Sequence, residues 1–213
     1  KFDNLISIII IFILALTINF LIVYFFKSLT ILTNLIIISS LFLIISSLID
    51  LKKSLEKSKF DLARIISHLS FGFLILFIGL NHNFSLEEDF NMKVGDTKSF
   101  NNYEIKFKKL EVKNFKNYKS LIGDLEIKDK KMSQIKTLNP EIRIYESPST
   151  LTYEAAIKTN IIKDYYLTMS NIDRSDFYNI KFQKKPMMFW IWVSCMVLAI
   201  GGFLRVFQNA KNN

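Results

Sequence analysis

Two histidines are the residues of this 213-residue sequence best suited to chemistry. His68 lies four residues after Arg64, inside an apolar run, and His82 lies near the far end of that run. Imidazole suits haem iron, zinc, copper or a proton relay. A polar side chain at membrane depth is costly unless something compensates it, so His68 is a candidate for function. A hydrogen bond to a neighbouring helix, to Ser67 or to Ser70 would also satisfy it.

The spacing of the two histidines limits what they can bind together. They are 14 positions apart, and at 1.5 Å per residue this is about 21 Å along a helix. One iron atom cannot take both while the segment stays helical. If His68 is one of two axial imidazoles of a haem, the second must come from another chain or from sequence outside these residues. His82, between two asparagines, is expected to be interfacial and hydrated.

Several other kinds of site are excluded by composition. The single cysteine, Cys195, excludes a disulfide scaffold and a paired-thiol site, and it is expected to be a small buried hydrophobe. The sequence has no glycine-rich phosphate loop. The polar segment after His82 contains neither His nor Cys, so a Ser-His or Cys-His pair cannot form within it. The acidic cluster at 87–89 is expected to be a solvated stalk.

Both histidines belong to one of four long apolar runs. About 20 apolar residues cross the hydrocarbon core as a helix, and a helix satisfies its own backbone groups in lipid. Gly72, Gly79, Gly201 and Gly202 lie in the third and fourth runs and are expected to allow close helix packing. We therefore expect four transmembrane helices, based on the runs at 4–26, 31–49, 65–80 and 186–204.

The distribution of Lys and Arg predicts the orientation of these helices, because basic residues gather in cytoplasmic loops. The connection between the first two helices carries only Lys27, and the C-terminal tail carries Arg205 and Lys211. The rule places the tail and the basic loop in the cytoplasm and the polar segment outside, which is the periplasm in a bacterium. The basic residues of the loop are Lys52, Lys53, Lys57, Lys59 and Arg64.

The polar segment between the third and fourth helices is patterned as short strands. Apolar and polar residues alternate with period two in four places, which are separated by turn signals such as Gly95-Asp96 and Asn139-Pro140. We expect a small antiparallel β-sandwich or barrel. The four alternating segments are Tyr103–Phe107, Leu121–Ile127, Ile142–Tyr145 and Phe177–Phe182.

The net charge of +9 does not indicate a nucleic-acid ligand. Within the polar segment, 19 Lys and Arg residues stand against 15 Asp and Glu residues, without a basic stripe interleaved with aromatics. The expected organisation is two transmembrane helices at 1–50, a cytoplasmic basic loop at 51–64, a transmembrane helix with His68 at 65–82, a periplasmic β domain at 83–185, a transmembrane helix at 186–207 and a cytoplasmic tail at 208–213.

A series of short phrases, in a fixed order, resembles a known family. The order resembles the C-terminal part of the CcmF family, the membrane haem lyase subunit of cytochrome c maturation, and a related lyase of nitrite reductase assembly. The resemblance runs from about Arg64 to Phe207. The phrases are Ala63–His68, Met92–Asp96, Glu141–Tyr145, Tyr153–Ile157, Lys163–Leu167, Lys185–Trp192 and Gly201-Gly202.

The resemblance implies a function in the bacterial inner membrane. The family takes haem from a haem chaperone and joins it to the Cys-x-x-Cys-His motif of an apocytochrome c that a partner subunit presents. It also holds a haem b between two membrane histidines, and His68 matches one of these axial iron ligands. The family usually has a glycine two residues after this histidine, where this sequence has Ser70.

The departures from the family imply that this chain does not act alone as an enzyme. The tryptophan-rich haem-handling segment, its two flanking periplasmic histidines and the other haem b ligand have no match in the sequence. Together with a start at Lys1, this indicates the C-terminal piece of a lyase or a separately encoded subunit. The alternative is a non-enzymatic membrane assembly factor or sensor with an extracytoplasmic β domain. A transporter is disfavoured because three of the four helices lack buried charges.

Overall fold

The chain forms two compact units in a computed structural model that describes residues 2–26, 29–56, 61–131, 134–172 and 176–212. One unit is helical and comprises Lys1–Phe84 and Pro186–Asn213; the other is a β domain at Ser85–Lys185. The predicted fold class, four apolar helices plus an antiparallel β domain, is confirmed. Lys27, Lys57 and Lys59, which contributed to the predicted orientation, lie outside the described residues, as does the side chain of Lys211.

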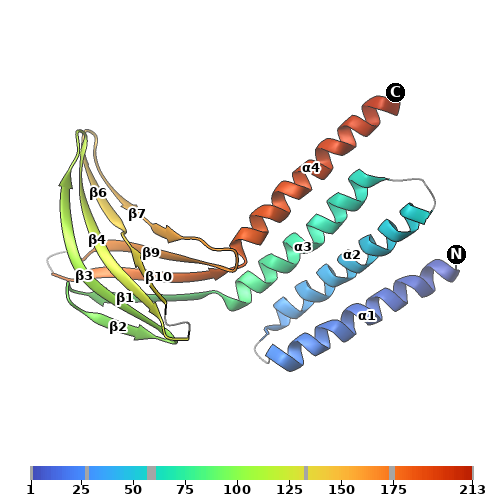
Figure 1. Cartoon of the computed structure of the whole chain (residues 1–213), viewed down its shortest axis with the longest axis horizontal. Coiled ribbons are helices and arrows are strands. Elements are labelled where there is room, and N and C mark those ends of the chain that lie inside the picture. The colour runs from blue at the N-terminus through green and yellow to red at the C-terminus, as the bar shows by residue number, and fades with distance from the viewer. Residues whose placement is uncertain (1, 27–28, 57–60, 132–133, 173–175, 213) are drawn as a thin grey trace. The chain divides into compact units, whose positions relative to one another are not determined.

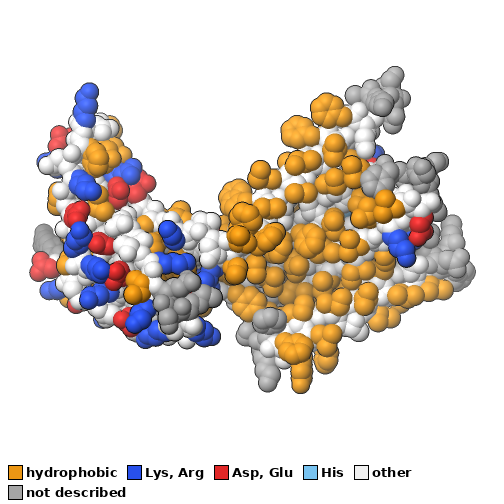
Figure 2. Space-filling view, in the orientation of Figure 1, with side chains coloured by type: hydrophobic (Ala, Val, Ile, Leu, Met, Phe, Trp, Pro, Cys, Tyr) orange, Lys and Arg blue, Asp and Glu red, His pale blue; other side chains and the backbone are white. Residues whose placement is uncertain are grey.

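The helical unit places its four helices side by side in chain order (Figure 1). Each is long and apolar enough to cross a membrane. The third helix packs against the second and the fourth, while the first packs against the second. Hydrophobic side chains cover most of the visible face of this unit (Figure 2). The helices are α1 (Phe2–Phe26), α2 (Ile31–Glu56), α3 (Leu62–Phe84) and α4 (Met188–Asn212).

Glycines set the close approach of α3 to its two neighbours. A Cβ added to Gly72 would lie 2.8 Å from Ile44 Cγ1 of α2, and one added to Gly201 of α4 would lie 3.0 Å from the Ser67 backbone nitrogen of α3. Gly79 approaches α2 in the same way. Gly202 has no neighbour within 4 Å of its Cβ position, so close packing at this glycine is not seen among the described helices.

The adjacent pair Gly201 and Gly202 provides a matched test of this packing. We expect Gly201→Leu to destabilise the helical unit by about 1–3 kcal/mol, because the new side chain has to displace the α3 backbone. Gly202→Leu should be neutral or slightly stabilising, since Leu favours helix and meets open space. Thermal unfolding of both variants in detergent measures the difference, and equal melting temperatures would contradict the assigned contact.

The β domain is an antiparallel sandwich of two sheets. One sheet has the order β1-β10-β9-β8, and the other has the order β2-β3-β4-β6-β7, with β5 paired to β4. The strands are β1 (Leu86–Met92), β2 (Thr97–Phe100), β3 (Tyr103–Asn114), β4 (Tyr118–Asp129), β5 (Gln134–Leu138), β6 (Glu141–Glu146), β7 (Ser149–Glu154), β8 (Ala156–Lys158), β9 (Lys163–Asn171) and β10 (Tyr178–Pro186).

The four segments with predicted alternation lie in β3, β4, β6 and β10, except that Phe177 precedes the start of β10. The predicted stalk is wrong, because Glu87, Glu88 and Asp89 belong to β1 and pair along β10. Glu87 contacts Lys181 and accepts a hydrogen bond from Gln183 across the ladder. Glu87 and Asp89 line the solvent side of the strand, whereas Glu88 points to its other, partly buried side.

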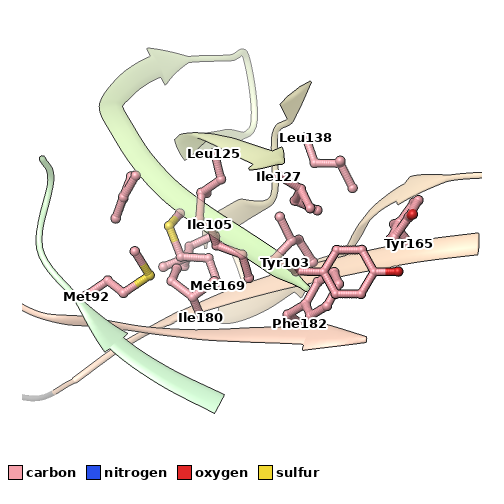
Figure 3. Close-up of a cluster of buried hydrophobic side chains, with 13 residues drawn as sticks. Met92, Tyr103, Ile105, Leu125, Ile127, Leu138, Tyr165, Met169, Ile180 and Phe182 are labelled. Atoms are coloured by element: carbon pink, nitrogen blue, oxygen red, sulfur yellow. The ribbon is translucent and has the colours of Figure 1, made fainter. Parts of the chain in front are cut away.

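The sandwich core gathers apolar side chains from both sheets (Figure 3). Phe107, Tyr165 and Phe182 are among its largest fully buried side chains. At one end, the ring of Tyr103 lies 5.8 Å from that of Tyr165 and 5.3 Å from that of Phe182, centre to centre. Figure 3 shows the hydroxyl groups of both tyrosines at this same end.

Burial makes the stability of the β domain sensitive to high pH. It raises the pKa of Tyr165 from 10.0 to about 12, because the phenolate would lose its hydration. The protonated Tyr165 phenol is therefore favoured in the folded state, so its contribution to the stability of the β domain is fully present below about pH 10. We expect stability to fall between about pH 10 and 12, by about 2–3 kcal/mol for this residue.

Denaturant unfolding at a series of pH values tests this expectation. Tyr165→Phe should flatten the fall above about pH 10, whereas Tyr153→Phe, at an exposed site, should leave it unchanged. An unaltered pH dependence in Tyr165→Phe would show that this phenol does not control alkaline unfolding.

Candidate functional site

His68 lies on a face of α3 that neither α2 nor α4 covers. It is exposed, as is Arg64 one turn before it. Phe71 and Ile78 continue the stripe with 46% and 47% of their surfaces exposed, and the exposed His82 ends it. Positions three, four and seven apart share a helix face, so the two histidines stand on one stripe about 21 Å apart.

The remaining faces of α3 are occupied by helix packing. Ser70 is buried and donates hydrogen bonds to its own helix, to the carbonyls of Ile66 at 2.5 Å and Ser67 at 3.2 Å. The Ser67 hydroxyl lies beside Gly201 of α4. Within the described parts of the chain, His68 forms no hydrogen bond with Ser67, with Ser70 or with a neighbouring helix, so none of these alternatives is observed.

An apolar crevice of about 300 Å³ lies between α3 and α4. Phe73, Phe77 and Trp190 line it, with the ring centres of Phe77 and Trp190 6.0 Å apart. Its two serines, Ser70 and Ser194, both donate to backbone carbonyls of their own helices. The crevice therefore presents hydrocarbon and aromatic carbon, and its lining offers no nitrogen ligand for a metal.

The start of α3 is fixed by Asp61, seven residues before His68. The Asp61 carboxylate accepts a hydrogen bond from the Arg64 backbone N–H at 3.3 Å, as an N-cap does, and it binds Arg205 of α4 at 3.1 Å. Arg64 reaches Asp50 of α2 at 3.8 Å. Carboxylates and guanidinium groups thus connect the ends of three helices.

The other end of α3 is tied by the asparagines that flank His82. The Asn83 side-chain oxygen accepts a hydrogen bond from the Thr30 backbone N–H at 3.2 Å, next to the start of α2. The Asn81 amide donates to the carbonyl of Pro186, just before α4. Because both ends are held, the rotation of α3 and the direction of the His68 face are set.

Sequence reasoning singled out His68 as a candidate, which stays a prediction, and did not single out Asp61, Asn81 or Asn83. An aspartate at the first turn of a helix is a recognisable N-cap signal, so Asp61 could have been found. The asparagines give no such signal, because their partners are backbone groups of distant segments.

Removing the Asp61 carboxylate should weaken the helical unit. We expect Asp61→Ala to cost about 1–2 kcal/mol, since it removes an N-cap and the contact with Arg205. Asp50→Ala, which removes one exposed ion pair, should cost less than about 0.5 kcal/mol. Thermal unfolding in detergent compares the stabilities of the two variants. Equal losses of stability would argue against the capping role of Asp61.

Comparison with known proteins finds a family model and relatives that share this architecture. Residues 83–186 match the family model described as CcmF C-terminal beta-sandwich. The chain resembles the C-terminal part of the CcmF family. This confirms the resemblance seen in the sequence, and the apolar helices together with these relatives mark a membrane protein. The matched family segment begins at residue 83 and so does not include His68.

Individual relatives extend the similarity into the helices. The cytochrome c-type biogenesis protein CcmF of Escherichia coli is 27% identical over 145 residues, which is 68% of this chain and 22% of the relative. The CcmF of Haemophilus influenzae is 25% identical over 144 residues, again 68% of this chain and 22% of the relative. The alignments thus span about a fifth of the length of these relatives.

A solved structure shares the fold over nearly the whole chain. It is named cytochrome c heme lyase CcmF, and it superposes with a TM-score of 0.69 at 14% identity. The match covers 94% of this chain and 34% of the solved one. The helices and the sandwich therefore recur together in that protein.

Proposed function

We propose that the chain serves as the C-terminal portion of a cytochrome c biogenesis haem lyase. In this function it contributes His68 as an axial ligand of a haem b and an extracytoplasmic β domain to covalent attachment of haem to apocytochrome c. The proposal is supported by relatives named as cytochrome c-type biogenesis proteins and by the shared fold of a protein named heme lyase.

The observation that carries the proposal is the exposure of His68 on the uncovered face of α3. An axial ligand needs an imidazole nitrogen free to bind iron, and no hydrogen bond to His68 is found among the described residues. Phe71, one turn further along, offers an apolar surface of the kind that borders a porphyrin. The residues present therefore fit a haem edge, with the second imidazole supplied from outside these residues.

The chain's own residues would orient this ligand rather than perform the ligation. Asp61, Asn81 and Asn83 hold both ends of α3, and the glycines hold its flanks, so the imidazole keeps one direction. Haem, when bound, supplies a redox-active iron whose potential depends on its axial ligands and burial.

The β domain would act by binding. Its sequence between 84 and 185 has neither His nor Cys, so it supplies no Ser-His or Cys-His pair. With Lys52, Lys53 and Arg205 at the cytoplasmic side, the domain faces the periplasm of a bacterial inner membrane. There it could contact the rest of the lyase, the haem chaperone, apocytochrome c or its presenting subunit.

Absorbance spectroscopy tests the ligand assignment. The chain is tagged, purified from its source membranes with its bound partners, and a reduced-minus-oxidised spectrum is recorded. We expect His68→Ala to lower the haem b signal at least about tenfold, because an axial ligand is lost. His82→Ala, on the same stripe of the same helix, is the matched control and should keep the signal.

Chemical rescue separates ligation from a folding defect. In His68→Gly, added imidazole can occupy the space of the lost side chain, so it should restore the haem b spectrum. A wild-type spectrum in His68→Ala would contradict the proposal and favour a non-enzymatic assembly factor or sensor. Failure of rescue with a correctly assembled complex would count against His68 as the ligand.

A further inference from the structure

One end of the β sandwich holds a buried ion pair beside two tyrosines. Lys163 Nζ lies 2.9 Å from Asp129 Oδ2, and the two side chains are only 11% and 9% exposed. The Tyr165 hydroxyl donates a hydrogen bond to the same carboxylate at 3.4 Å. Tyr103 stands opposite Asp129 in the β3–β4 register, so the pair is enclosed by aromatic carbon.

Two further lysines converge on this ion pair. The ammonium groups of Lys136 and Lys163 lie 4.7 Å and 5.3 Å from the centre of the same Tyr165 ring. Lys184 of β10 is partly buried and lies two residues after Phe182 on the same face of the strand, and the Phe182 ring centre is 6.2 Å from that of Tyr165. Burial first, and then the positive charge of Lys163, lowers the pKa of both Lys136 and Lys184.

The cluster carries more positive than negative charge. Among Lys136, Lys163 and Lys184, only Lys163 forms an ion pair with Asp129 in the described ranges. The nearby Lys131 and Lys158 add further positive charge. Across the described ranges, no carboxylate forms an ion pair with Lys136 or Lys184. Partly buried ammonium groups are costly without a counter-ion, so this arrangement is suited to an anion from outside the domain.

Lys184 lies close, along the chain, to the ends of α3 and α4. It pairs with Leu86, which follows the end of α3 by two residues, and it precedes Met188, the start of α4, by four residues. Four extended residues span about 13 Å. The polar headgroup layer is about 5–8 Å thick on each side of the hydrocarbon, and a lysine side chain adds several ångströms of reach.

We propose that Lys136, Lys163 and Lys184 form a binding site for the phosphate group of an anionic membrane lipid. The partly buried ammonium groups and their short distance along the chain from two membrane helices favour a headgroup over a phosphate free in solution. The site does not depend on haem or on His68.

Native mass spectrometry of the whole chain in detergent tests the site. The chain is titrated with phosphatidylglycerol, phosphatidylcholine or inorganic phosphate. We expect preferential binding of phosphatidylglycerol, and about 30-fold weaker binding in Lys136→Gln/Lys184→Gln, because each lysine near an anionic surface contributes roughly a factor of five. Circular dichroism checks that the variant keeps its β structure.

A second double variant controls for charge alone. Lys116→Gln/Lys119→Gln removes two exposed lysines near the β3–β4 turn, at the opposite end of these strands from Asp129, and should bind phosphatidylglycerol like the wild type. Equal losses of phosphatidylglycerol binding in both double variants would show that only the net charge of the domain matters, and would overturn the site. Equal binding of inorganic phosphate and phosphatidylglycerol by the wild type would overturn the lipid assignment.

Discussion

Close backbone contact between α3 and its two neighbours is the constraint on which the helical unit depends. At Gly72 and Gly201 a side chain would meet atoms of the next helix, so only hydrogen fits. Apolar runs in lipid gain no hydrophobic energy from packing on each other, and such contacts must then supply the association. They use two faces of α3 and leave the third, with His68, uncovered.

The sequence was sufficient to predict the helices and the strands in which apolar and polar residues alternate regularly. Runs of about 20 apolar residues have one structural solution in a membrane, and Tyr103–Phe107 alternates because one side is buried in the sandwich. β1 escaped prediction because Glu87-Glu88-Asp89 reads as a solvated cluster. Its pairing depends on Lys181 and Gln183, almost a hundred residues away, and local propensity carries no information about such partners.

For the candidate sites, too, local sequence patterns predict some features, whereas others depend on contacts between segments that are far apart in the sequence. Helical spacing placed His68 and His82 on one helix, but the identity of the uncovered face follows only from where α2 and α4 pack. The lysines around Asp129 are dispersed over three strands, and in sequence they look like ordinary surface charge. Folding brings Lys136 and Lys163 over one tyrosine ring, a juxtaposition that single-strand patterns do not contain.

The polypeptide enters the sandwich through β1 and leaves it through β10, and these two strands are hydrogen-bonded neighbours. Entry and exit points that adjoin in this way make the domain a cassette inserted into a helical hairpin. Exchange of the whole cassette at residues 85 and 186 leaves the separation of the two helix ends unchanged. Recombination could therefore replace the outer module of such a protein while its intramembrane architecture persists.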